Sequence, residues 1–130
     1  MYLRFITSGI DEDSEREVGL FHAVFELRDS GKLSVEEEAR LKEISDWFDE
    51  NLEKPKRFTT SKPPHYRKKS KALSWFKDGA EEHLSRIREI SEILRHHNIP
   101  TRMLKTDRVG YIVYEDQFQI VAEPFADTPR

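Results

Sequence analysis

The chain has 130 residues, of which 36% are charged and 36% hydrophobic, and it contains eight Phe, two Trp and four Tyr. This length is typical of one compact domain, and the aromatic residues are too numerous for a disordered polyampholyte. Because the chain has no Cys, disulfides, thiolate zinc sites and cysteine nucleophiles are excluded. The N-terminus lacks the apolar run of a signal peptide, and no segment approaches the about 18 apolar residues of a membrane span. We therefore expect a cytoplasmic protein that forms a single domain over residues 1–130.

The formal net charge of −3 hides a strong segregation of charge along the chain. Residues 11–53 carry fifteen acidic and five basic side chains, whereas residues 54–71 carry eight basic side chains and no acidic one. A net charge of −10 is thus followed directly by a net charge of +8. The small total does not exclude a polyanionic partner, because the basic side chains are concentrated in one segment.

The first elements predicted along the chain are a strand over Tyr2–Thr7 and two helices. Two Ser-x-x-Glu patterns, beginning at Ser14 and Ser34, fit capping boxes in which each side chain bonds the other residue's backbone N–H. Apolar residues at spacings of three and four follow both patterns. They are Val18, Phe21, Val24, Phe25 and Leu27 or Arg28 in the first helix, and Leu41, Ile44, Trp47, Phe48 and Leu52 in the second. The short connection around Gly31 predicts an antiparallel helical hairpin.

The segment 54–71 has three Pro residues and no helical or strand period, which predicts a loop or a partly disordered arm. A strand over Ala72–Phe76, a helix that ends at His97 and a strand over Thr101–Thr106 follow. This order favours a right-handed parallel crossover. The last run, GYIVYEDQFQIVAEPF, predicts a hairpin that begins at Gly110 and turns at Glu115, Asp116 and Gln117.

These elements define an α+β fold in the order β-α-α-loop-β-α-β-β-β. We expect a mixed, mostly antiparallel sheet of about five strands, with the helical hairpin and the third helix on one face.

The sequence from ALSWFKDGAEEHL through GYIVYEDQFQIVAEPF resembles a group of small uncharacterised bacterial proteins. Members of that group likewise begin with a YLR-type strand and end in a hairpin similar to GY-x-VYED-x-x-Q-x-VAEPF. The resemblance extends over the whole chain and implies a bacterial origin and a single domain. No activity, ligand or catalytic residue is attached to it.

The basic segment is the strongest functional feature of the sequence. Its cationic side chains suit phosphate contacts, because each neutralised phosphate releases condensed counterions. Aromatic residues among them suit stacking on unpaired bases. We therefore expect an accessory domain that binds nucleic-acid backbone through this segment. The alternative is that the segment is a solvated loop that folds back on the acidic hairpin. The predicted nucleic-acid-binding residues are Lys54, Lys56, Arg57, Phe58, Lys62, His65, Tyr66, Arg67, Lys68, Lys69 and Lys71.

The second helix carries a dense row of carboxylates that favours a protein-interaction or regulatory function, although such a row is also typical of the solvated side of an amphipathic helix. The predicted partner-binding residues are Glu36, Glu37, Glu38, Glu43, Asp46, Asp49 and Glu50. An exposed face of the sheet near Tyr114 and Phe118 is the alternative surface for a partner. The sequence leaves the oligomeric state open.

Enzyme activity has weaker support in the sequence. His65, Tyr66 and Arg67 bring together a base, a phenol and a cation, as a metal-independent nuclease requires, so His65 is the candidate catalytic residue. Adjacent His96 and His97 diverge on a helix, and no HExxH motif is present, so we expect no metal site. Glu115 and Asp116 fit a turn better than a metal-dependent nuclease site. The glycines are not clustered into a phosphate-binding loop, and we expect no cofactor.

Overall fold

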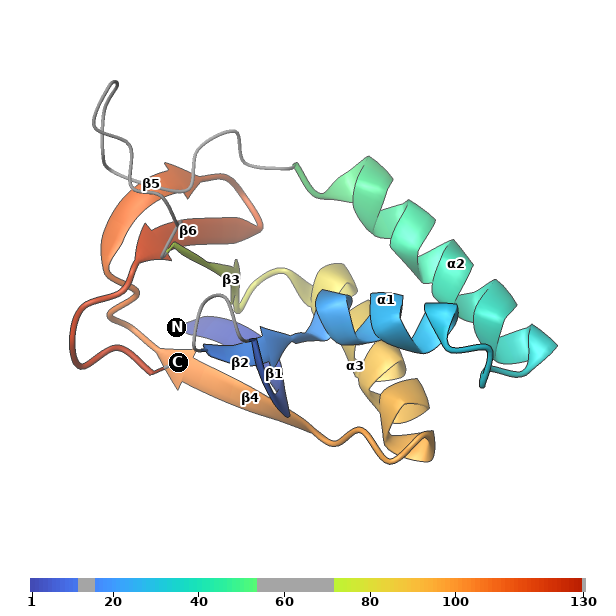
Figure 1. The fold of residues 1–130 in the computed structure, drawn as a ribbon. Coiled ribbons are helices and arrows are strands. Elements are labelled where there is room, and N and C mark those ends of the chain that lie inside the picture. The colour runs from blue at the N-terminus through green and yellow to red at the C-terminus, as the bar shows by residue number, and fades with distance from the viewer. Residues whose placement is uncertain (12–15, 54–71, 130) are drawn as a thin grey trace, which may run out of the picture. The chain divides into compact units, whose positions relative to one another are not determined.

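Figure 1 shows the fold in a computed structural model, which describes residues 1–11, 16–53 and 72–129. The elements are β1 (Tyr2–Asp11), β2 (Arg16–Gly19), α1 (Leu20–Asp29), α2 (Val35–Asn51), β3 (Leu73–Lys77), α3 (Glu81–His96), β4 (Thr101–Thr106), β5 (Tyr111–Glu115) and β6 (Gln119–Glu123). The predicted α+β fold is confirmed. Five strands pair in the order β2-β1-β3-β6-β5, with β4 paired to β1 off this path.

The pairings along this path are antiparallel. Leu3 of β1 faces Phe76 of β3, and Trp75 of β3 faces Ile120 of β6. Strands β3 and β4, which flank α3 in the sequence, both pair with β1, while the handedness of the crossover between them stays a prediction. The short strand β2 was not predicted: it occupies residues that the sequence pattern assigned to the start of the first helix.

The chain divides into two compact units, each made of separate stretches of sequence. The sheet unit comprises Met1–Arg4, Lys54–Glu81 and Met103–Arg130. The helical unit comprises Phe5–Glu53 and Glu82–Arg102. That residues 1–130 form one domain stays a prediction.

The core of the sheet unit forms around Trp75, which is 0% exposed. It lies in a cluster with Leu73, Val109, Ile120 and Ala122, and the partly buried Tyr2 and Leu104 pack against this cluster. Gly110, at the start of the final hairpin, has a φ of +120°. A Cβ there would overlap the backbone of Glu123 and Pro124, so this close approach requires glycine.

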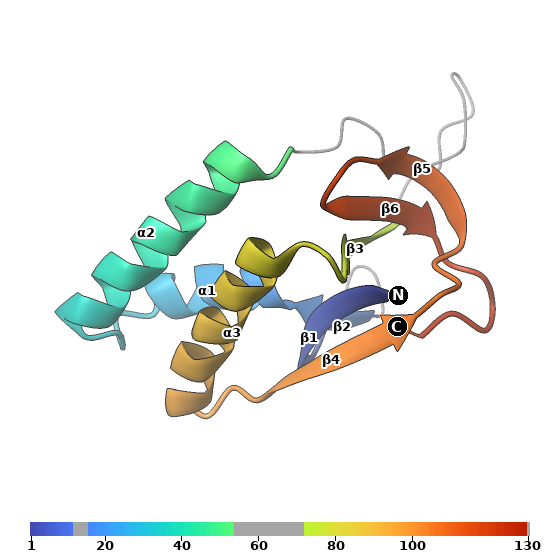
Figure 2. The same cartoon turned by 180° about the vertical axis from the view of Figure 1, so that it is seen from behind.

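The helical unit contains α1, α2 and nearly all of α3 (Figure 2), and each of these helices buries apolar side chains. The buried apolar residues of these helices are Leu20, Ala23, Val24 and Leu27 of α1, Leu41, Ile44 and Phe48 of α2, and Leu84, Ile87, Ile90 and Leu94 of α3. Both views show α1 and α2 as a hairpin, as predicted.

Two predictions about α1 were wrong. The helix begins at Leu20, with Gly19 as its N-cap and no side-chain cap, so the Ser-x-x-Glu pattern at Ser14 does not start it. Glu17 of this pattern lies in β2, and Ser14 lies outside the described residues. The buried stripe also differs from the predicted one. Val24 and Leu27 of the predicted stripe are buried, together with Leu20 and Ala23, whereas Phe21 and Phe25 are exposed.

Local capping and turn patterns were predicted correctly elsewhere. Ser34 and Glu37 form the expected capping box at the start of α2. Asn98 adopts a φ of +62° just after α3, which ends the helix as predicted. Asp116 occupies the turn of the final hairpin and accepts hydrogen bonds from the N–H groups of Phe118 and Gln119 at 2.8 and 3.0 Å.

Candidate interaction surfaces

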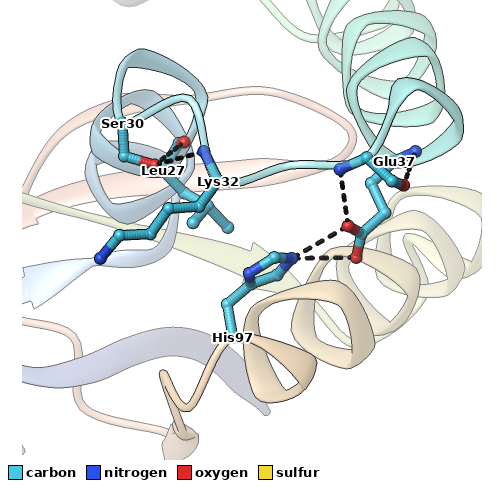
Figure 3. Close-up of polar contacts among 6 residues, drawn as sticks. Leu27, Ser30, Lys32, Glu37 and His97 are labelled. Atoms are coloured by element: carbon cyan, nitrogen blue, oxygen red, sulfur yellow. Dashed lines mark hydrogen bonds and ion pairs between the residues drawn. The ribbon is translucent and has the colours of Figure 1, made fainter.

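Glu37 lies in the first turn of α2, and its carboxylate faces His97, the residue that follows α3 (Figure 3). It accepts a hydrogen bond of 3.0 Å from the N–H of Ser34. Nε2 of His97, just beyond α3, lies 3.0 Å from both of its oxygens. The two side chains are only 18% and 23% exposed, His97 being the less exposed. The Ser34 hydrogen bond, followed by the contact with His97, lowers the pKa of Glu37 below its usual value.

Other carboxylates of the predicted acidic surface also have basic partners in the fold. Glu38 lies 2.8 Å from Arg28 of α1, and Asp46 lies 2.8 Å from Lys42. Glu43 lies 3.1 Å from Arg40, which also makes two hydrogen bonds of 2.7 Å to Glu89 of α3. Glu37, Glu38, Glu43 and Asp46 of the predicted partner-binding residues therefore contact basic side chains. Glu36, Asp49 and Glu50 are exposed.

A groove of about 280 Å³ runs along α2 and α3. It is lined by Arg40, Glu43, Ile44, Asp46, Trp47, Glu50 and Arg86. The Arg86 guanidinium stacks 3.8 Å from the centre of the Trp47 ring, a cation–π contact. On the same ring, the buried His83 packs edge-on at 4.7 Å, and its Nε2 lies 2.9 Å from the carbonyl oxygen of Asn51.

Trp47, which the sequence pattern places among the apolar residues of the second helix, is half-buried and forms a wall of the groove. Sequence reasoning also missed Arg40 and Arg86 as groove residues. Arg86 is separated from Trp47 by 39 positions, and the chain has no motif that joins them.

The most exposed aromatic side chain of the helical unit is Phe25 of α1, at 68% exposure. Phe21, one turn earlier on the same side of the helix, is 37% exposed and packs edge-on against Phe48 of α2 at 5.1 Å. The pair lies beside the exposed His22 and Glu26, which contact each other at 2.9 Å. We call Phe21 and Phe25 the α1 aromatic pair.

The final hairpin offers a different surface from the predicted one. Tyr114 and Phe118 are half-buried, and the Tyr114 hydroxyl donates a hydrogen bond of 2.8 Å to Asp116. Burial opposes ionisation of Asp116, but hydrogen bonds from Phe118, Tyr114 and Gln119 outweigh it and lower its pKa. The exposed aromatic residue is Tyr111, which packs edge-on against Phe125 at 4.8 Å.

The predicted nucleic-acid-binding residues between Lys54 and Lys71 lie outside the described residues, and so does the candidate catalytic residue His65. Among the side chains that the structure describes, no group of three or more potential metal ligands comes together. Within residues 1–11, 16–53 and 72–129, no helix combines the length and apolar character needed to cross a membrane.

Comparison with models of protein families, with curated proteins and with solved structures gives no significant match.

Proposed function

We propose that the chain is a protein-interaction module that binds a partner on the hairpin of α1 and α2. The exposure of Phe25 is the observation that carries this proposal. An aromatic side chain on the outside of a helix gains free energy when a partner covers it, and fully burying a Phe contributes about 1.5–3 kcal/mol. Phe21 adds apolar surface next to it and is fixed in place by its contact with Phe48.

Charge specifies the chemistry of the partner. The stretch from Leu20 to Asn51 carries nine acidic and four basic side chains, so the hairpin keeps a net charge of −5. A field of this sign accelerates association with a positively charged partner. The proposed partner is therefore a protein segment with an apolar anchor for the α1 aromatic pair and basic residues at its edges.

The test compares proteins captured from a bacterial lysate by the wild-type chain and by three variants, with quantification by mass spectrometry. Phe25→Ser removes the anchor, and we expect at least a tenfold loss of one basic partner, because about 1.4 kcal/mol corresponds to tenfold in affinity. Glu36→Lys with Glu50→Lys lowers the captured amount most strongly at low salt. Met103→Ser, which changes an exposed apolar residue of β4, is the matched control. An identical set of captured proteins for wild type and Phe25→Ser would refute the proposal.

A second candidate function is the binding of nucleic-acid backbone through residues 54–71. Its support is that Glu37, Glu38, Glu43 and Asp46 already contact basic side chains of the described fold. The eight basic residues of the segment are therefore not required to neutralise these carboxylates, and they remain suited to a polyanion.

Fluorescence anisotropy with a labelled single-stranded oligonucleotide tests this candidate across a range of salt concentrations. Replacing Lys68 and Lys69 by Ala removes two phosphate contacts, so the log–log salt slope falls by about 1.4, at about 0.7 per phosphate of a single strand. The control replaces Lys32 and Lys105, two exposed bases outside the segment. Binding that does not depend on salt, or no binding at low salt, would exclude this function.

A further inference from the structure

Two aromatic side chains and an arginine lie together beside the final hairpin of the sheet unit. Tyr111, the first residue of β5, is 62% exposed, and its ring packs edge-on against Phe125 with the ring centres 4.8 Å apart. The Arg108 guanidinium lies 5.2 Å from the centre of the Phe125 ring, within the range of a cation–π contact. We call Tyr111, Phe125 and Arg108 the aromatic–arginine cluster.

Hydrogen bonds and close packing fix this cluster in place. The hydroxyl of Thr128, which is 5% exposed, donates to the carbonyl oxygen of Arg108 at 2.9 Å and accepts from the N–H of Phe125 at 3.0 Å. The residue before Tyr111 is Gly110, where the backbone approaches the end of β6 so closely that a Cβ would overlap it. The groups that a ligand would contact are therefore held in position before it binds, which lowers the ordering cost of binding.

The guanidinium of the cluster is accessible to an anionic ligand. Arg108 lies 3.8 Å from the carboxylate of Asp127, and the two side chains are 68% and 69% exposed. An exposed ion pair of this length contributes little to stability, so a phosphate can replace the carboxylate, because Arg forms strong charge-assisted hydrogen bonds with phosphate oxygens. Glu123, which faces Tyr111 in the register of β5 and β6, is 4% exposed and is not presented at the surface.

The chain connectivity attaches the basic residues 54–71 close to this cluster. Lys71, the last of them, precedes Leu73 of β3 by two positions. Leu73 faces Ala122 of β6, and Ala122 faces Ile112, the neighbour of Tyr111 in β5. Leu73 is therefore two strand spacings, about 10 Å, from β5. A polyanion that contacts the basic residues is thereby brought near the exposed Tyr111 ring.

We propose that the aromatic–arginine cluster binds one nucleotide of a single-stranded nucleic acid, with the unpaired base stacked on Tyr111 and the phosphate on Arg108. An exposed ring suits any unpaired base, and the neighbouring guanidinium suits the phosphate. The proposal rests on the same polyanionic ligand as the second candidate function and adds a contact with its bases, so the ligand is single-stranded. It is independent of the α1 aromatic pair, which belongs to the helical unit.

Fluorescence anisotropy tests the proposal with a labelled oligodeoxythymidine strand and an abasic strand of the same length, which has the same phosphates and no bases. We expect the wild type to bind oligodeoxythymidine at least about fivefold more tightly, the lower end of a base–aromatic stack. Tyr111→Ala removes this preference and Tyr111→Phe retains it. The matched control is Ile112→Ala, which truncates the next exposed apolar side chain, on the opposite face of the strand, and keeps the preference. Arg108→Gln weakens binding of both strands and lowers the log–log salt slope by about 0.7.

Three results would overturn the proposal: a wild type that binds both strands equally, a Tyr111→Ala variant that keeps the preference, and an Ile112→Ala variant that loses it. Because Tyr111 and Ile112 are exposed, their replacement should leave the fold intact, which circular dichroism verifies. Equal binding of both strands, weakened by the replacement of Lys68 and Lys69, excludes this proposal and leaves the second candidate function standing. A wild type that binds neither strand at low salt excludes both, while capture of a protein partner through Phe25 is unaffected by any of these outcomes.

Discussion

Replacement of glycines by Ala gives a graded test of how tightly the final hairpin is built. At Gly110, Ala must adopt a φ of +120°, and backbone strain of this kind costs about 1–3 kcal/mol. Its Cβ also overlaps the carbonyl group of Glu123 and lies 2.8 Å from Cα of Pro124. These are backbone atoms, so the end of β6 must shift, and a forced shift of this kind costs about 1–3 kcal/mol more. We expect Gly110→Ala to lower the free energy of unfolding by about 2–6 kcal/mol.

Two other glycines separate strain from overlap. Gly31 has a φ of +74° with nothing within 4 Å of an added Cβ, so Ala there costs only the left-handed conformation, about 1–2 kcal/mol. Gly79 has open space and no positive φ, so its replacement should change stability by less than about 0.5 kcal/mol. Urea unfolding followed by circular dichroism measures all three variants. Equal losses at Gly110 and Gly31 would show that the contact with β6 has no energetic weight and would refute the reasoning.

Three further predictions are measured by the same urea unfolding. Glu37→Gln removes a carboxylate whose pKa is lowered in the folded protein. Such a group stabilises the fold above its unfolded pKa of about 4.3, and this stabilisation is lost as the pH falls. Below about pH 5 the wild type should therefore lose stability more steeply than the variant. Asp116→Ala removes the acceptor of hydrogen bonds from Tyr114, Phe118 and Gln119 and should cost about 2–4 kcal/mol, with Asp116→Asn costing less. Phe25→Ser should cost less than about 0.5 kcal/mol, whereas Leu27→Ala, at a buried position of α1, should cost about 2–5 kcal/mol. The first prediction is contradicted if the stability of Glu37→Gln depends more steeply on pH than that of the wild type. The second is contradicted by an unchanged unfolding midpoint in Asp116→Ala, and the third by equal losses of unfolding free energy in Phe25→Ser and Leu27→Ala.

Features set by residues close in sequence were the ones that the sequence predicted well. The capping box joins Ser34 to Glu37, three positions later. In the turn, Asp116 accepts hydrogen bonds from the backbone N–H groups two and three positions later. In both cases a short polar side chain accepts a hydrogen bond from a nearby backbone N–H. Such a local bond competes with the regular hydrogen bonds of a helix or sheet, so it marks where these elements begin or end. The order of the elements followed from such boundaries together with the hydrophobic periods.

Features that depend on tertiary contacts could not be read in this way. Helix α1 has apolar residues at Leu20, Phe21, Val24, Phe25 and Leu27, so two neighbouring stripes compete and the period does not say which one faces inward. The choice of Leu20, Val24 and Leu27 left Phe25 exposed. Likewise, His97 reaches Glu37 across 60 positions, and Arg86 reaches Trp47 only because α3 lies beside α2. No local pattern encodes these pairs.

The division of the chain into interleaved units has a consequence for its synthesis. The helical unit ends at Arg102, so all of its residues exist before β5 and β6 are made. The sheet unit joins Met1–Arg4 to Met103–Arg130, and Leu3 must wait for Phe76, its partner in β3. During translation, which proceeds from the N-terminal side, Leu3 is thus made well before Phe76, and both strands of this pair are made before β5 and β6. Until β3 is made, the start of β1 lacks the strand with which it pairs in the folded protein.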